Sequence, residues 1–175
     1  TVIVTGAGIG IGRATAKAFA KAGYRVVVTD ILEKEGSDVA ADIVKSGGAA
    51  EFRKLDVRST AAVDALVASV EKEHGGIDAV VANAGIARKT SLAMLTDEKW
   101  EETVEVDLKG VFRVVRAAAA GMRQRKKGAV VCTSSIMGVA YGWDEHVHYS
   151  AAKAGVVGLI RGLAVELAKD GVRVN

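Results

Sequence analysis

Short runs of Val, Ile and other apolar residues alternate along the chain with longer segments whose apolar positions recur at helical spacing. The short runs are apolar throughout, as expected of strands that are buried on both faces of a sheet. They predict strands near residues 1–5, 25–29, 50–55, 77–82, 128–133 and 172–175. The longer segments predict helices near residues 10–22, 33–46, 59–74, 98–126 and 148–169. This alternation is typical of a parallel sheet covered by helices, so we expect a three-layer α/β/α fold.

Nothing divides the 175 residues, because no linker, repeat or low-complexity stretch interrupts the pattern. Half of the residues (50%) are hydrophobic, which is enough for the core of one domain. No apolar run approaches the length of about 18 residues that a membrane span needs, and we expect a soluble, cytoplasmic domain over residues 1–175. The chain begins and ends within strand patterns, from which we expect the core of a longer protein.

Charge and cysteine content narrow the possible functions. The net charge is +3, and residues 123–127 form one basic cluster in an otherwise mixed pattern. A nucleic-acid surface is one interpretation, but we favour a helix C-terminus, where cations and a following glycine such as Gly128 are common. Cys132 is the only cysteine and lies in an apolar run, so we expect a buried, unreactive thiol.

A glycine-dense turn follows the first predicted strand. It contains Gly6, Gly8, Gly10 and Gly12, at a point where a backbone without side chains can approach a pyrophosphate group. The following helix presents unpaired N–H groups and a partial positive charge to such an anion. The spacing differs from the commonest dinucleotide-binding motif, because Ile11 stands where that motif has a glycine. A tight turn without a ligand is the alternative interpretation.

Asp30 ends the second predicted strand, downstream of the glycine turn. A carboxylate at this place can accept hydrogen bonds from both ribose hydroxyls of NAD, and it would repel the 2′-phosphate of NADP. The sequence therefore predicts NAD as the cofactor, with NADP less favoured. Alternatively, Asp30 caps the helix that begins near Glu33.

Further motifs complete a resemblance to a known family. They are Thr-Gly-x-x-x-Gly-Ile-Gly at residues 5–12, Leu-Asp-Val at 55–57, Asn-Ala-Gly at 83–85, Ser135, and Tyr-x-x-x-Lys at 149–153. In this order they make the whole chain similar to the short-chain dehydrogenase/reductase family. The resemblance implies a doubly wound fold of the Rossmann type, a nicotinamide cofactor, and interconversion of an alcohol with a ketone or aldehyde.

The resemblance also implies where the cofactor and partners bind. Asp56 and Val57 would contact the adenine, and Asn83, Ala84 and Gly85 would border the adenosine ribose. The residues expected at the cofactor are Gly6, Gly8, Ile9, Gly10, Ile11, Gly12, Asp30, Asp56, Val57, Asn83, Ala84, Gly85, Tyr149 and Lys153. Relatives commonly pair through their two long helices, here 98–126 and 148–169, as homodimers or homotetramers. In the family a further strand and a substrate lid follow, beyond residue 175.

Tyr149 and Lys153 are four residues apart in a predicted helix, about one turn, so their side chains share a face. A phenol is a poor base at neutral pH, and a nearby ammonium favours the phenolate. The resemblance implies that Tyr149 exchanges a proton with the substrate, that Lys153 also binds the nicotinamide ribose, and that Ser135 holds the substrate oxygen. Ser134 could take the serine role, but Gly138 lies three residues after Ser135, as in the family pattern.

One position departs from the family. A Val-Asn-Leu-x-Gly segment is usual in the long helix before the fifth strand, whereas residues 106–110 read Val-Asp-Leu-Lys-Gly. Asp107 can accept hydrogen bonds and hold a water molecule, but it adds negative charge near Lys153, and we include it among the catalytic residues. Two alternatives stay open: an NADPH-dependent 3-oxoacyl-thioester reductase, against which Asp30 argues, and a cofactor-sensing protein with little turnover.

The segment between Ser135 and Tyr149 should line the substrate entrance. His146 and His148, beside Asp144 and Glu145, could be read as a metal cluster. Alternating residues of an irregular loop lack a defined third ligand, so we expect no metal. We expect a polar rim of the substrate site, with solvated loop residues as the alternative.

Overall fold

The computed structural model describes all 175 residues and contains one sheet of six parallel strands. The strands are β1 (Val2–Thr5), β2 (Arg25–Asp30), β3 (Ala49–Lys54), β4 (Ala79–Ala82), β5 (Gly128–Cys132) and β6 (Val172–Val174). Their order in the sheet is β3-β2-β1-β4-β5-β6. This order confirms the predicted Rossmann-type doubly wound fold, in which the winding direction reverses between β1 and β4.

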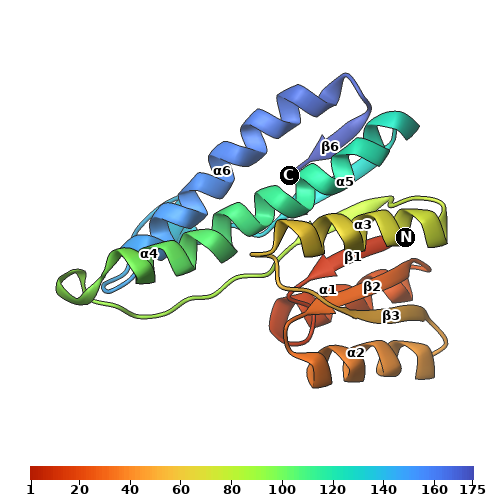
Figure 1. The fold of residues 1–175 in the computed structure, drawn as a ribbon, viewed down its shortest axis with the longest axis horizontal. Helices are drawn as coiled ribbons and strands as arrows, with labels where there is room; N and C mark the ends of the chain where they lie inside the picture. The colour runs from red at the N-terminus through yellow and green to blue at the C-terminus, as the bar shows by residue number, and fades with distance from the viewer.

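Helices cover both faces of the sheet (Figure 1). They are α1 (Gly10–Lys21), α2 (Glu33–Lys45), α3 (Thr60–His74), α4 (Asp97–Val104), α5 (Val111–Arg125) and α6 (Val147–Ala168), with 3-10 turns η1 (Leu92–Met94) and η3 (Ile136–Gly138). Strand β1 shows how the layers form: Val2 and Val4 pack with α1 and α2, whereas Ile3 packs with α3, α5 and α6. Because successive side chains point to opposite faces, a strand buried on both faces must be apolar throughout.

The predicted single helix 98–126 is wrong in one respect. A π-helical segment, η2 (Glu105–Gly110), separates α4 from α5. Such segments add a residue to one turn and are frequent at functional sites. Here the segment carries Asp107, which is fully buried. Apolar spacing does not reveal the insertion, because the helices on either side keep their own faces toward the core.

Cys132 and the basic cluster behave as predicted. Cys132 is buried, and burial raises the pKa of its thiol to about 11. The cluster ends α5, where Arg123 and Lys126 both pair with Asp170, at 2.7 and 2.6 Å. These cations therefore form ion pairs within the fold. None of the helices is both long enough and apolar enough to span a membrane.

Helix α2 approaches strand β3 so closely that Gly36 can carry no side chain. A Cβ atom on Gly36 would lie 2.1 Å from Cε2 of Phe52. Gly36→Ala should therefore lower the free energy of unfolding by about 1–3 kcal/mol through overpacking. In a Phe52→Ala background there is no phenyl ring to clash with. Gly36→Ala should then stabilise α2 by up to about 1 kcal/mol, because alanine favours the helix more than glycine does. Urea denaturation of the four proteins measures the coupling, and an equal loss in both backgrounds would contradict this packing.

Candidate active site

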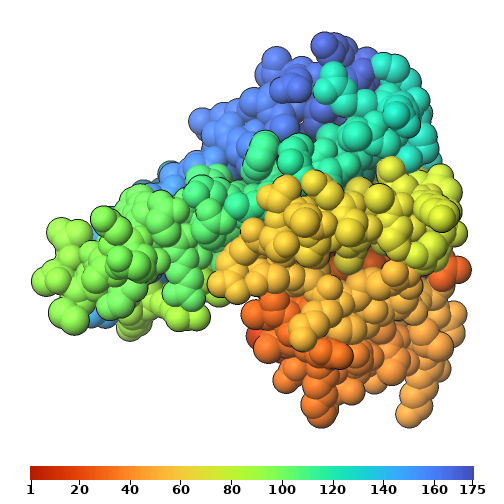
Figure 2. Space-filling view, in the orientation of Figure 1, coloured from red at the N-terminus to blue at the C-terminus, as the bar shows by residue number.

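The carboxyl ends of the strands border a cleft of about 730 Å³. Because the strand order reverses between β1 and β4, the loops that follow these strands diverge and leave a crevice. Figure 2 shows this side hollowed between the green segment around α4 and the orange N-terminal half. The predicted site residues in the lining are Gly6, Ile9, Gly10, Ile11, Asp30, Asp56, Val57, Asn83, Ala84, Gly85, Asp107, Tyr149 and Lys153. Three predicted residues, Gly8, Gly12 and Ser135, lie outside the lining.

The glycine turn leaves room beside the start of α1. Gly10 adopts a left-handed φ of 55°, and no atom lies within 4 Å of where its Cβ would be. Ile9, at the N-cap, makes no side-chain hydrogen bond, so the first N–H groups of α1 have no side-chain cap. A Cβ on Gly12 would lie 2.1 Å from the Gly6 carbonyl oxygen, so the helix can sit against the turn only with glycine there. Open space beside uncapped N–H groups fits a pyrophosphate.

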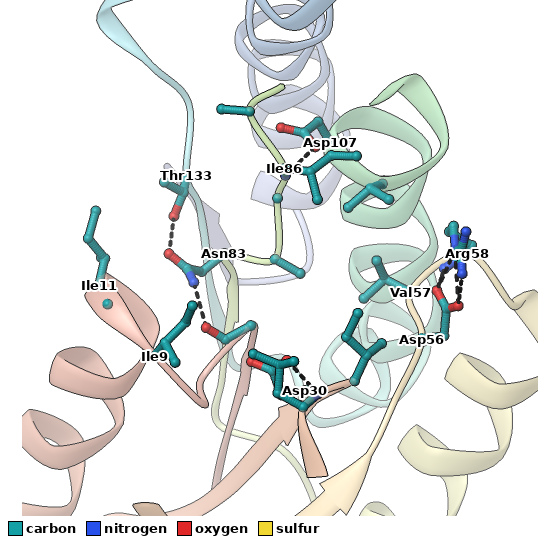
Figure 3. A pocket seen from close by; sticks show the side chains of 18 of the residues that line it. Ile9, Ile11, Asp30, Asp56, Val57, Arg58, Asn83, Ile86, Asp107 and Thr133 are labelled. Atoms are coloured by element: carbon teal, nitrogen blue, oxygen red, sulfur yellow. Dashed lines mark hydrogen bonds and ion pairs between the residues drawn. The ribbon is translucent and has the colours of Figure 1, made fainter. Parts of the chain in front are cut away.

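Asn83 ties together the ends of three strands, as Figure 3 shows. Its Nδ2 donates to the carbonyl oxygens of Thr5 at 3.1 Å and Gly6 at 3.2 Å, after β1. Its Oδ1 accepts from the Thr133 hydroxyl at 3.3 Å, after β5. The Thr5 hydroxyl accepts in return from the backbone N–H groups of Asn83 and Ala84, both at 3.0 Å. These bonds hold the floor of the cleft in place.

Asp30 is buried at the end of β2, where its carboxylate braces two backbone segments. Oδ2 accepts from the Gly8 N–H at 2.8 Å, and Oδ1 accepts from the Leu32 N–H at 3.0 Å. Leu32, not Asp30, is the N-cap of α2. The carboxylate therefore has a fixed orientation at the cleft, and its negative charge faces the space beside the glycine turn (Figure 3).

Lys153 is buried, with 3% of its surface exposed, and its ammonium has one hydrogen-bond acceptor and one ion-pair partner. Nζ donates to the Thr133 carbonyl at 3.0 Å and lies 3.3 Å from Oδ2 of Asp107. It also lies 5.7 Å from the centroid of the Tyr149 ring, within cation–π range. A Cβ on Gly85 would come within 3.1 Å of Asp107 Oδ2 and 3.2 Å of Lys153 Nζ, so glycine makes room for this ion pair.

Asp107 is the buried acid of the site. Its Oδ1 accepts from the Ile86 N–H at 2.8 Å (Figure 3), and its Oδ2 faces Lys153. Burial raises the pKa of the Asp107 carboxyl above its ordinary value, and the Lys153 charge opposes this only in part. The structure thus brings Asp107 together with Lys153, as expected from the sequence.

The two serines after β5 have different contacts. The Ser134 hydroxyl donates to the Lys153 carbonyl at 2.8 Å, so it is engaged with the backbone of α6. The half-buried Ser135 accepts from the Met137 N–H at 3.2 Å, at the start of η3. The contacts of Ser134 therefore support the preference for Ser135 as the serine that contacts substrate.

The expected polar rim is wrong for both histidines. His148 is buried on α6, and burial lowers the pKa of its imidazole. His146 is also buried, and its Nδ1 donates to the Asp144 carbonyl at 2.8 Å. Helix α6 packs against η2 and η3, which explains the burial of His148 and is not indicated by residue type alone.

Thr133 and Arg58 are among the lining residues that were not predicted. Thr133 supplies both the carbonyl that accepts from Lys153 and the hydroxyl that donates to Asn83. Arg58 binds the Asp56 carboxylate through Nε at 3.0 Å and Nη2 at 2.6 Å, which lowers the pKa of Asp56. The place of Thr133, at a strand end directly before the two serines, is the signal that could have identified it.

A family model described as short chain dehydrogenase matches residues 1–175. The chain belongs to the short-chain dehydrogenase family. This short-chain dehydrogenase is 39% identical to the (5R,7aS)-5-hydroxy-7a-methyl-1-oxo-2,3,5,6,7,7a-hexahydro-1H-indene-carboxyl-CoA reductase of Mycobacterium tuberculosis, over 99% of this chain and 67% of that protein. It is 40% identical to the 3-oxoacyl-(acyl-carrier-protein) reductase FabG of Aggregatibacter actinomycetemcomitans, over 100% of this chain and 73% of that protein.

A solved structure is similar as well. A gluconate 5-dehydrogenase from Burkholderia cenocepacia, in complex with NADP and tartrate, superimposes with a TM-score of 0.93 at 32% identity, over 99% of this chain and 68% of that one. The short-chain dehydrogenase described here is therefore an oxidoreductase with a nucleotide-binding Rossmann fold. Its cofactor is a nicotinamide dinucleotide and its substrate a small molecule.

The raised pKa of Asp107 predicts how stability depends on pH. The unfolded carboxyl ionises near its ordinary value of 3.8, whereas the folded carboxyl ionises at higher pH, so Asp107 lowers stability progressively as pH rises above 3.8. Asn cannot ionise. The stability of Asp107→Asn relative to wild type should therefore increase between pH 4 and pH 7, as measured by urea unfolding.

Asp42 provides a control of opposite sign. The Lys17 ammonium lowers the pKa of the Asp42 carboxyl, so its contribution is present above the ordinary value and is lost as pH falls. Asp42→Asn should therefore lose stability relative to wild type only as pH rises toward 3.8, and the difference should stay nearly constant between pH 4 and pH 7. If both variants show the same trend, the assigned environment of Asp107 is wrong.

Proposed function

We propose that this protein transfers a hydride between NAD(H) and a secondary alcohol or ketone, with Tyr149 as general acid and base. Tyr149, Lys153 and Asp30 line one cleft, and this shared cleft is the main support for the proposal. We further propose that residues 1–175 hold the cofactor site and the catalytic residues in one domain.

The cleft residues fit a nicotinamide dinucleotide. The turn at Gly10 and the start of α1 would hold the pyrophosphate, Asp30 the adenosine ribose, and Lys153 the nicotinamide ribose. Asp56 and Val57 would border the adenine. The cofactor, when bound, supplies or accepts the hydride.

The remaining steps belong to residues of this chain. In reduction the Tyr149 hydroxyl donates its proton to the substrate oxygen, and in oxidation the phenolate accepts it. The Lys153 ammonium stabilises the phenolate, while Thr133 and Asp107 hold that ammonium in place. The Ser135 hydroxyl would donate a hydrogen bond to the same substrate oxygen.

Asp30 supports NAD over NADP. Its buried carboxylate faces the region that a 2′-phosphate would enter, and the turn carries Ile9 and Ile11 instead of basic residues. Arg58 lines the same cleft, but its guanidinium already pairs with Asp56. Arg88 also lines the cleft and pairs with Glu102 at 3.0 Å, so each arginine of the lining already has a carboxylate partner.

A second candidate is an NADPH-dependent 3-oxoacyl-thioester reductase. The names of the reductases of Mycobacterium tuberculosis and Aggregatibacter actinomycetemcomitans favour it, because both act on acyl thioesters by those names. The two candidates share the Tyr149 step and differ in cofactor and substrate, so assays with both cofactors on thioester and simple ketone substrates distinguish them.

We also infer assembly into dimers or tetramers through α5 and α6. Both helices expose large apolar side chains, Phe112 on α5 at 46% and Val165 on α6 at 82%. The resemblance to the family, whose members commonly pair through these helices, gives the same expectation.

Loss of the Tyr149 hydroxyl tests the mechanism. Tyr149→Phe should lower kcat by about 10² to 10⁴-fold, because one proton-transfer group is lost while the ring and its packing remain. The Kd for NADH, measured by fluorescence titration, should change little. Tyr24→Phe removes the hydroxyl of a tyrosine outside the cleft and serves as the control. A Tyr149→Phe protein with more than about a tenth of wild-type kcat would show that another group transfers the proton.

Neutralisation of Asp30 tests the cofactor assignment. Asp30→Asn keeps one of the two oxygen acceptors for the backbone and removes the charge, so the ratio of kcat/KM for NADH over NADPH should fall by about tenfold or more. Asp38→Asn removes an exposed carboxylate of α2 and should leave the ratio unchanged. Equal efficiencies of the wild-type protein with the two cofactors would exclude NAD selection by Asp30.

A further inference from the structure

Four rings form a continuous series from the cleft to the surface. The Tyr149 ring lies 6.2 Å from the His146 ring at 77°, and His146 lies 6.3 Å from Trp143 at 80°. Trp143 then lies 6.3 Å from Tyr141 at 37°. The first two contacts are edge-to-face, which is a favourable geometry for aromatic pairs.

Backbone contacts hold His146, the ring next to Tyr149, in place. His146 is 7% exposed, and its Nδ1 donates to the Asp144 carbonyl, which leaves Nε2 without a hydrogen-bond partner in the protein. Glu145 adopts a left-handed φ of 60°, a strained conformation for a residue with a side chain. Its carbonyl accepts from the Thr90 N–H at 2.8 Å, which attaches this turn to the segment before η1. The turn therefore presents the His146 ring in one orientation beside Tyr149.

The two outer rings of the series are exposed to solvent. Trp143 is 60% exposed and Tyr141 is 51% exposed, whereas His146 is nearly buried. Ile136 and Val139, in the same segment, are also exposed. Large apolar side chains gathered in this way indicate a binding surface. This surface lies outside the lining of the cofactor cleft, and Tyr149 is the residue that the two share.

We propose that Tyr141, Trp143 and His146 form an aromatic wall of the substrate site, which selects ketones and secondary alcohols that carry a flat ring next to the reacting carbon. This inference rests on the proposed function, because it takes Tyr149 as the residue at the substrate oxygen. A substrate whose oxygen meets Tyr149 directs one substituent along the wall. A planar ring can stack on Trp143 and Tyr141, whereas a linear chain loses this contact and only buries apolar area.

The test compares two alcohols with the same number of carbon atoms, 1-phenylethanol and 2-octanol, in oxidation by the purified protein. Wild type should favour 1-phenylethanol in kcat/KM. Trp143→Leu keeps an apolar side chain without a ring and should lower the ratio of the two efficiencies by about three- to tenfold. Trp143→Phe keeps a ring and should retain most of the ratio. Trp100→Phe, which alters the other tryptophan, is the control and should leave both efficiencies unchanged.

If Trp143→Leu leaves the ratio of kcat/KM for 1-phenylethanol over 2-octanol unchanged, the proposed aromatic wall is wrong. The proposed alcohol oxidation would not be affected by that result. If wild type oxidises neither alcohol, the proposed function is wrong for such substrates. The aromatic wall is then tested separately, by the binding of acetophenone. In a Trp100→Phe background Trp143 is the sole tryptophan, and acetophenone should quench its fluorescence with a saturating dependence on concentration. Quenching that rises linearly without saturation indicates collisions alone and would also overturn the wall.

Discussion

The ammonium group of Lys153 has almost no access to water, and a buried cation is costly unless acceptors surround it. Its two oxygen partners come from different parts of the fold: the Thr133 carbonyl, which accepts a hydrogen bond, follows β5, and the Asp107 carboxylate, which forms an ion pair, belongs to the π-helical segment η2. Lys153 itself lies on α6. One charge therefore fixes the relative positions of a strand end and two helices. The geometry around Tyr149 depends on this arrangement, because Tyr149 is one turn from Lys153 on the same helix.

The ion pair places strict demands on its surroundings. Gly85 must lack a side chain, since a Cβ would enter the space of both charged groups. The Asp107 side chain must point into the protein to reach Lys153. Asp107 lies within η2, where the helix has an extra residue per turn. A neutral amide at residue 107 would still accept from the Ile86 N–H, but it would not balance the charge of Lys153. The carboxylate therefore gives Lys153 a charged partner, whereas an amide would be only a polar one.

Much of the fold and the site could be predicted from the sequence. The apolar runs identify strands such as β1, because Val2, Ile3 and Val4 are all buried, and the glycine turn with Asp30 identifies the end of the sheet that holds the cleft. The π segment was missed because a local insertion does not alter the apolar faces of α4 and α5. Thr133 was missed because its contribution to Lys153 is a backbone carbonyl, which any residue offers. The burial of His148 was missed because it depends on segments that are distant in sequence.

Every neighbouring pair of strands in the sheet is parallel, so none can form as a hairpin. The hydrogen bond from the Asn83 N–H to Thr5 joins residues 78 positions apart, and it closes at the junction of β1 and β4 where the cleft lies. Contacts of such long range form late and slowly in folding, because the loop entropy must be overcome first. On the ribosome, β1, β2 and β3 emerge before β4, so the glycine turn and Asp30 lack the opposite side of the cleft until β4 has left the exit tunnel. A nascent chain can thus hold half of a nucleotide site before it is able to bind the nucleotide.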